Sequence, residues 1–178
     1  MQRTSFGDMH CPIARSLERV GEWWSILILR DAFLGATRFD EFQDSLGIAP
    51  NMLTRRLRAL TDAGLLERRR YSEKPPRYEY VLTPRGRDFR PVLLALMAWG
   101  NRHFAPEGPA MQLIDERTGD AVEPVMVDAK TGDLIDRKHH AMHAGPAADA
   151  RMRARADANL RKRAQERSAS SSTSPRSE

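Results

Sequence analysis

The first forty residues alternate apolar helical stripes with glycines. Apolar residues recur at helical spacing from Ile13 to Trp24, and we expect Gly21 to divide this run into two helices. Residues 23–34 are apolar nearly all round, which is typical of a helix buried at the centre of a small domain. We expect Gly35 to end that helix.

Two further helices are predicted before the pattern changes. In the first, Phe39 and Leu46 share one face, Thr37 is the expected N-cap and Gly47 ends the helix. The second is expected over residues 50–63, with a proline in its first turn and a glycine after it. At 100° per residue, its apolar side and its polar side separate cleanly. The apolar side holds Leu53, Leu57 and Leu60, and the polar side holds Asn51, Thr54, Arg55 and Arg58.

A change of period after residue 64 predicts a β-hairpin. Residues 67–71 and 78–82 are strand-like, and residues 72–77 form a polar, proline-rich connection. Thr83 and Pro84 resemble an N-cap and first helical residue, and they open a predicted long helix over 84–104.

The helix predicted over 84–104 has two apolar faces. One contains Phe89, Val92, Leu93, Leu96 and Trp99, and the other contains Leu94, Met97 and Ala98. Two apolar faces require two partners in packing. One is the domain's own core, and the simplest second partner is another copy of the chain. The alternative is that residues 105–145 fold back over this helix.

The remaining chain is expected to form two smaller units. Residues 105–146 contain short strand-like runs separated by Thr-Gly-Asp turns, and we interpret them as a small β-appendage. Residues 147–178 form a tail that is expected to be partly helical and, from 168 onward, disordered. The predicted fold is therefore mainly α with a small β-hairpin (α+β): a winged helix-turn-helix domain over 1–104, the appendage and a flexible tail.

Composition adds a charge pattern to this picture. The chain has 178 residues and a net charge of +5. This total hides values of +5 for residues 1–104, −5 for 105–150 and +5 for 151–178. The longest uninterrupted apolar run, residues 92–99, is far shorter than a membrane span, and the N-terminus lacks the apolar region of a secretory signal. A single cysteine excludes an internal disulfide framework. We therefore expect a cytoplasmic protein that makes no membrane contact.

The basic excess of the first block is concentrated on one helix–hairpin unit. Eight Arg and Lys residues lie within 51–78. On the exposed helix face, Asn suits adenine, Arg suits guanine, and Thr bonds a base or a phosphate. We therefore expect Asn51, Thr54, Arg55 and Arg58 to read bases in the major groove of double-stranded DNA. We expect Arg69, Arg70, Lys74 and Arg77 to hold the DNA backbone. The alternative is that these charges form only a solvated face.

The order of elements and several short motifs resemble the HxlR-type winged-helix regulators of bacteria. The motifs are residues 11–13, Trp24, 28–31 with Gly35 and 38–39, then 48–60, and finally 64–68, 75–80 and 82–86. The resemblance covers residues 10–104. It implies a homodimeric DNA-binding transcription factor that pairs through its N-terminal helix and the helix over 84–104. We expect a nucleoid-associated regulator that acts on a palindromic operator, as a repressor rather than as an activator.

Cys11 is a candidate redox sensor because it precedes a helix and lies near Arg15. It also resembles the N-terminal cysteine with which some family members sense oxidants or electrophiles. The alternative is a small residue without a signalling role. Three possibilities for the signal stay open: an oxidant, an unknown small-molecule effector bound between dimer and appendage, or none.

No enzymatic or metal chemistry is expected. His139, His140 and His143 are the one histidine cluster, and we interpret them as part of a solvated loop rather than a metal site. The sequence shows no phosphate-binding glycine loop and no nucleophile paired with a base. We therefore expect neither a cofactor nor catalysis. Two alternatives stay open: a winged-helix module that binds an acidic protein without sequence-specific DNA binding, and an enzyme whose pocket the appendage completes.

Overall fold

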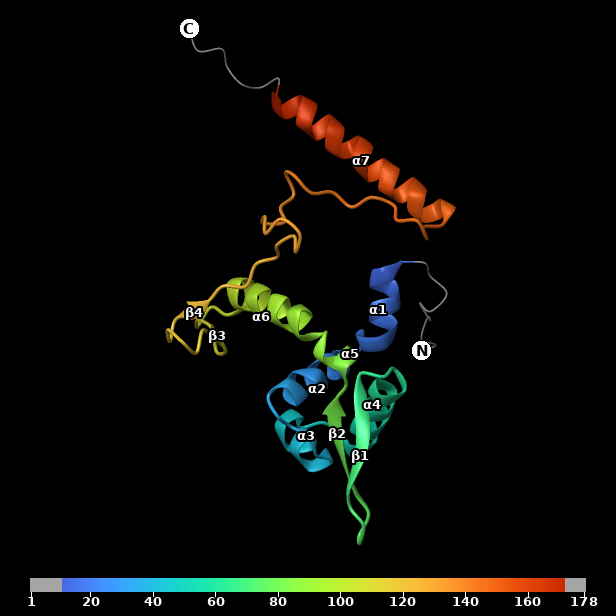
Figure 1. The fold of residues 1–178 in the computed structure, drawn as a ribbon, viewed down its shortest axis with the longest axis vertical. Coiled ribbons are helices and arrows are strands. Elements are labelled where there is room, and N and C mark those ends of the chain that lie inside the picture. Colours follow the sequence, from blue (N-terminus) through green and yellow to red (C-terminus); the bar gives the residue numbers. More distant parts are fainter. Residues whose placement is uncertain (1–10, 172–178) are drawn as a thin grey trace. The chain divides into compact units, whose positions relative to one another are not determined.

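The computed structural model describes residues 11–171, and it contains the first four helices and the hairpin that the sequence predicts (Figure 1). The chain divides into two compact units, one over residues 16–125 and the other containing residues 11–15 and 126–171. The elements are α1 (Pro12–Val20), α2 (Trp23–Phe33), α3 (Phe39–Leu46), α4 (Pro50–Asp62), β1 (Leu66–Ser72), β2 (Arg77–Leu82), α5 (Pro84–Arg87), α6 (Arg90–Phe104), β3 (Leu113–Ile114), β4 (Ala121–Val122) and α7 (Ala150–Ser171).

The core of the 16–125 unit lies between α2, α3, α4 and the start of β1. Its fully buried side chains come from each of these elements, which explains why α2 is apolar on nearly every side. Phe89, between α5 and α6, and Leu93, in the first turn of α6, pack against this cluster. The fully buried residues are Ile28, Leu29, Phe42, Leu53, Leu57, Leu60 and Leu66.

Helix α3 begins one residue later than the sequence predicts. Arg38, not Thr37, is the N-cap. The Glu41 carboxylate accepts hydrogen bonds from the backbone N–H groups of Thr37 and Arg38, at 2.7 and 2.9 Å. These two bonds lower the pKa of Glu41 below its ordinary value. A carboxylate three residues into the helix therefore does the capping that was expected of a hydroxyl. Gly47, in the left-handed conformation, then turns the chain toward α4.

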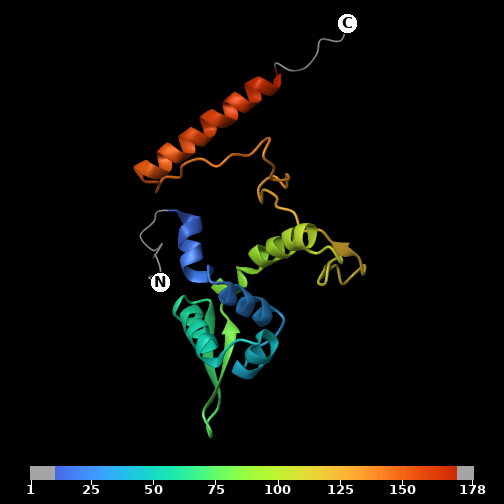
Figure 2. The same ribbon diagram turned by 180° about the vertical axis from the view of Figure 1, so that it is seen from behind.

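Strands β1 and β2 pair in antiparallel register from Leu66↔Leu82 to Arg70↔Tyr78, and an irregularity follows Arg70. The hairpin extends well beyond the helices of its unit, as Figure 2 shows. Two hydrogen bonds connect its base to the segment before α3 and to the turn after α4. The Tyr80 N–H donates to the Thr37 carbonyl at 2.7 Å, and the Thr83 hydroxyl donates to the Gly64 carbonyl at 2.7 Å.

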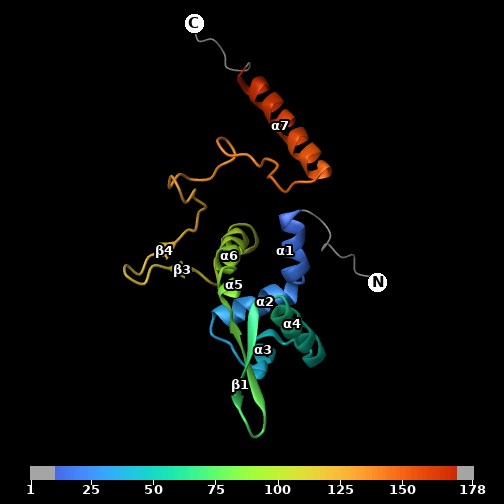
Figure 3. The same cartoon turned by 45° about the vertical axis from the view of Figure 1, so that its right-hand side comes forward.

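The prediction of a single helix over 84–104 is wrong, because the helix is interrupted at residues 88–89 and the segment forms α5 and α6 (Figure 3). Pro91 explains the break. A proline has no N–H to donate to the carbonyl four residues earlier, and its ring collides with that carbonyl. It is accepted in the first turn of α6, where no such bond is needed.

The appendage contains less β-structure than the sequence suggests. Strands β3 and β4 have two residues each, and a single bridge joins Val127 to Leu134. The repeated turns are present: Asp115 and Asp128 each accept a backbone hydrogen bond from the residue two positions later. Residues 105–125 pack in the same unit as α6. The functional division at residues 104 and 146 stays a prediction.

The tail is more helical than predicted. Helix α7 extends to Ser171, so the expectation of disorder from residue 168 is wrong for its first four residues. Residues 172–178, for which disorder was also predicted, lie outside the described part of the chain.

Candidate nucleic-acid interface

Helix α4 presents one buried face and one exposed face. The three leucines predicted to dock it are fully buried: Leu53, Leu57 and Leu60. The four residues predicted to read bases are exposed: Asn51, Thr54, Arg55 and Arg58. The leucines therefore fix which polar side chains face solvent.

The exposed arginines of α4 are held only loosely. Arg55 donates to the Met52 sulfur at 3.1 Å, which is a weak interaction. Arg58 lies 3.8 Å from the Asp62 carboxylate, and both side chains are largely exposed. Ion pairs of this kind contribute little to stability. Both guanidinium groups are consequently accessible to a new partner at small cost.

Arg56 has a different role, which the sequence analysis missed. Its side chain is 8% exposed and lies 2.7 Å from the carboxylate of Glu22, in the turn between α1 and α2. Arg56 belongs to the basic residues counted over 51–78, yet it is buried inside the unit. At 100° per residue it lies beside Leu53 and Leu60, so a helical wheel would have identified it. This ion pair connects α4 directly to the α1–α2 turn.

The basic side chains of the hairpin fall into two groups. The first group is engaged within the hairpin itself. Arg69 pairs with Glu67 at 3.0 Å, and this bond lowers the pKa of the Glu67 carboxyl. Arg70 donates to the carbonyls of Ser72 and Glu73, which braces the approach to the loop. Arg68 stacks over the Tyr78 ring.

Lys74 and Arg77 form the second group, at the hairpin loop. Both are exposed, and no ion pair is described for either of them within residues 11–171. Of the four hairpin residues predicted to hold the DNA backbone, these two are therefore the ones whose charges are not already used locally.

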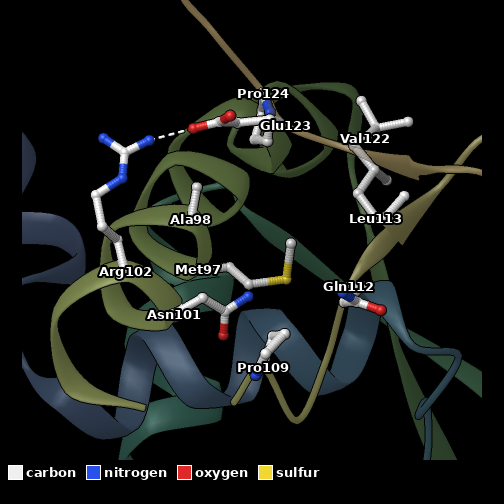
Figure 4. A pocket seen from close by; sticks show the side chains of 11 residues that line it. Met97, Ala98, Asn101, Arg102, Pro109, Gln112, Leu113, Val122, Glu123 and Pro124 are labelled. Carbon is white, nitrogen blue, oxygen red and sulfur yellow. Dashed lines mark hydrogen bonds and ion pairs between the residues drawn. The ribbon is translucent and has the colours of Figure 1, made fainter. Parts of the chain in front are cut away.

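Helix α6 carries two apolar surfaces, as predicted, and within residues 16–125 they differ in how far they are covered. Met97 and Ala98 face the β3–β4 hairpin across a partly open pocket of about 370 Å³ (Figure 4). At its edges the Asn101 side chain donates to the Met111 carbonyl at 2.9 Å, and Arg102 pairs with Glu123. Residues 105–125 thus cover one side of α6, as the fold-back alternative expects, and pairing with a second copy stays a prediction for the other side.

The other apolar surface of α6 remains exposed. Val92, Leu96 and Trp99 lie at helical spacing and are each about half exposed. On α1, Ile13 and Leu17 are exposed to a similar degree. Exposed apolar side chains at this spacing are typical of an interface with another protein chain.

Cys11 and the histidine cluster show no sign of a metal site. Cys11 is partly buried directly before α1, and its carbonyl accepts from the Arg15 N–H. The Asp136 carboxylate binds the backbone N–H and the ring of His139, at 2.7 and 2.9 Å. The bonds from His139 lower the pKa of Asp136 to about 2. Within residues 11–171, no three His, Cys, Asp or Glu side chains are grouped so as to hold a metal ion.

No helix in the described range is long and apolar enough to cross a membrane.

The family model of the HxlR-like helix-turn-helix matches residues 19–108, which contain α2 to α6. Among curated relatives, an uncharacterized HTH-type transcriptional regulator of Mycobacterium tuberculosis, Rv3095, is 38% identical over 141 residues. The match spans 79% of this chain and 89% of the relative.

Two solved structures are similar over most of the chain. PA1374 of Pseudomonas aeruginosa, a candidate transcription factor, is 57% identical, with a TM-score of 0.59 over 82% of this chain and 99% of that one. PA1607, also a candidate transcription factor, is 37% identical, with a TM-score of 0.71 over 80% of this chain and all of that one.

Proposed function

The chain belongs to the HxlR-like helix-turn-helix family of transcriptional regulators, and we propose that it is a homodimeric repressor that reads a palindromic operator through α4. The observation that carries this proposal is the division of α4 into two faces. A leucine face fixes the helix in the core, and the opposite face offers Asn51, Thr54, Arg55 and Arg58 to the solvent. These side-chain types match the hydrogen-bonding groups of the major groove.

Within this proposal, the residues of α4 and of the hairpin divide the work. Asn51, Thr54, Arg55 and Arg58 read base edges, with the N-terminal half of α4 reaching deepest into the groove. Arg69, Arg70, Lys74 and Arg77 hold the phosphate backbone beside it. Lys74 and Arg77 are the stronger candidates, since Arg69 and Arg70 must first exchange the local partners described above.

We propose that the dimer forms through α1 and α6. The exposed apolar side chains of α6 and α1 support this interface, because water-exposed surface of this kind is stabilised by burial against a second copy. A two-fold dimer brings two α4 helices to successive major grooves on one side of the duplex, about 34 Å apart. The protein would then act in the cytoplasm, on the nucleoid.

Selection of bound genomic fragments tests the regulator proposal. Purified full-length protein is mixed with sheared genomic DNA of its source organism, and the retained fragments are sequenced. We expect a few enriched fragments that share an inverted repeat, and gel shifts on them that resist competitor DNA. Retention of all fragments alike would instead favour a winged-helix module that lacks sequence-specific DNA binding.

The signal is a separate part of the proposal. We propose that DNA release responds either to an oxidant at Cys11 or to a small molecule in the pocket between α6 and β3–β4. That pocket, at about 370 Å³, is in the range that small-molecule sites occupy. Unchanged oxidant-induced DNA release in Cys11→Ser would eliminate the first possibility. A pocket variant such as Ala98→Trp tests the second, because it should block effector-induced release and leave binding without effector intact.

A further inference from the structure

Helix α7 has one face packed within its own unit. Its half-buried residues Met152, Ala156 and Leu160 recur every four positions. On the same side, Arg163 donates to the Arg137 carbonyl at 2.5 Å, and Arg167 donates to the carbonyl of Lys138. A neighbouring ion pair joins Arg137 to Glu166 at 2.9 Å. These contacts fix which way α7 is turned, and Figure 1 shows the preceding segment running beside the helix.

A second side of α7 is basic, and its centre lies about 120° around the helix from the packed side. At 100° per residue, Arg151, Arg155 and Lys162 fall within about 40° of one another, and they extend over roughly 16 Å of helix. All three are exposed, and no ion pair or hydrogen bond is described for their side chains within residues 11–171. We call these three residues the basic stripe. Of the two acidic residues in the helix, Asp157 lies on another side, and Glu166, one turn after Lys162 at the border of the stripe, is bound to Arg137.

The surroundings of the basic stripe restrict its partner. A helix that binds a membrane surface needs a free apolar face, but the apolar residues of α7 are on the packed side. A protein interface usually needs aromatic or large apolar anchors, whereas the residues that flank the stripe between Arg155 and Lys162 are Ala158 and Asn159. A line of cations without apolar anchors suits the sugar–phosphate backbone of nucleic acid, which presents a regular row of negative charges.

We propose that the basic stripe is a second, sequence-independent DNA contact, made to the backbone outside the operator. This inference rests on the proposed DNA-binding function of α4 and adds to it. The stripe would supply affinity for any duplex and would leave the discrimination between bases to Asn51, Thr54, Arg55 and Arg58.

The salt dependence of DNA binding tests this inference. Binding of the full-length protein to a mixed-sequence 40-bp duplex is measured by fluorescence anisotropy between 50 and 200 mM KCl. The test variant is R151Q/R155Q. The matched control is R153Q/R161Q, which removes two exposed arginines from other sides of the same helix. R151K/R155K preserves the charge of the stripe, and circular dichroism checks that α7 stays helical in every variant.

Each lost phosphate contact should reduce the slope of log K against log salt by about 0.9. We therefore expect R151Q/R155Q to flatten the slope by about 1.8 per subunit, equivalent to about a 12-fold smaller loss of affinity over this salt range. The control and the lysine variant should keep the wild-type slope. If R151Q/R155Q and R153Q/R161Q flatten the salt slope equally, the proposed DNA contact of the basic stripe is overturned, because a general charge effect would then explain both.

Other outcomes separate this inference from the proposed function. If the wild-type protein binds no duplex, both are wrong. If it binds duplex and Lys74→Ala flattens the slope while R151Q/R155Q does not, only the DNA contact of the basic stripe is wrong. If R151Q/R155Q keeps the DNA slope but loses binding to polyglutamate, the stripe serves an acidic protein instead, and the DNA contact is again overturned.

Discussion

Two neighbouring residues of α4, Leu57 and Arg58, should have separable effects on stability and on DNA binding. Leu57 is fully buried in the core, and Arg58 is largely exposed and makes one weak ion pair. Replacing either residue with alanine truncates a side chain to its Cβ atom in the same turn of α4. Leu57→Ala should therefore destabilise the fold and spare base recognition, whereas Arg58→Ala should do the reverse.

The two magnitudes follow from burial. Leu57→Ala removes three buried carbon groups, each worth about 0.8 kcal/mol of transfer free energy, and leaves a cavity that adds to the cost. We expect a loss of about 3–4 kcal/mol in the free energy of unfolding, or roughly 10 °C in melting temperature. Arg58→Ala breaks only an exposed 3.8 Å ion pair, so its effect on stability should stay within about 0.5 kcal/mol.

Guanidinium denaturation at fixed protein concentration measures the first effect, and the concentration is held constant because a dimer's stability depends on it. DNA binding is compared at a temperature where both variants are folded. Arg58→Ala should lose about 1–3 kcal/mol of operator preference and Leu57→Ala almost none. A destabilisation by Arg58→Ala as large as that of Leu57→Ala would refute the assignment of the two faces.

Four further predictions concern other parts of the chain. Gly86→Ala should destabilise by at least about 2 kcal/mol, seen as a lower melting temperature, because the added Cβ would lie 2.1 Å from the Leu65 carbonyl oxygen. Lys74→Ala should weaken binding to every duplex alike and flatten the salt slope by about one unit per subunit; an effect confined to the operator would contradict this. Leu96→Glu should shift the protein to monomer in sedimentation, and an unchanged dimer would exclude α6 from the interface. Asp136 should titrate near pH 2 in a carboxyl NMR titration. Because its folded-state pKa lies below the ordinary 3.8, its hydrogen bonds stabilise the 136–140 turn above that pH, and this stabilisation is lost as the pH falls through about 2. A titration midpoint near 3.8 would contradict the geometry.

Much of the winged-helix unit is predictable from sequence because its signals are local. Glycines mark the ends of α2, α3 and α4, and the leucine spacing of α4 fixes its buried face. Those same leucines identify the polar face as the exposed one. The candidate site is therefore implied by periodicity before any tertiary contact is known.

The features that sequence reasoning missed depend on competition between neighbours. The break before α6 arises because Pro91 overrides a continuous apolar stripe. Arg56 is buried because Glu22, far away in sequence, supplies a carboxylate at 2.7 Å. The Arg70 guanidinium donates hydrogen bonds to the carbonyls of Ser72 and Glu73, which only the folded hairpin brings near it. Counting charges along the chain gives no information about which of them are already paired.

The ratio of operator affinity to random-duplex affinity tests the central claim most directly. It is measured for wild-type protein and for R55A/R58A at one fixed salt concentration, with an operator taken from the selected fragments. Base reading by α4 predicts that the double variant loses about 30-fold to 2 × 10⁴-fold of this ratio for each subunit that binds, at about 1–3 kcal/mol per arginine. If the ratio stays at the wild-type value while both affinities fall together, α4 contacts only the DNA backbone and the account is contradicted.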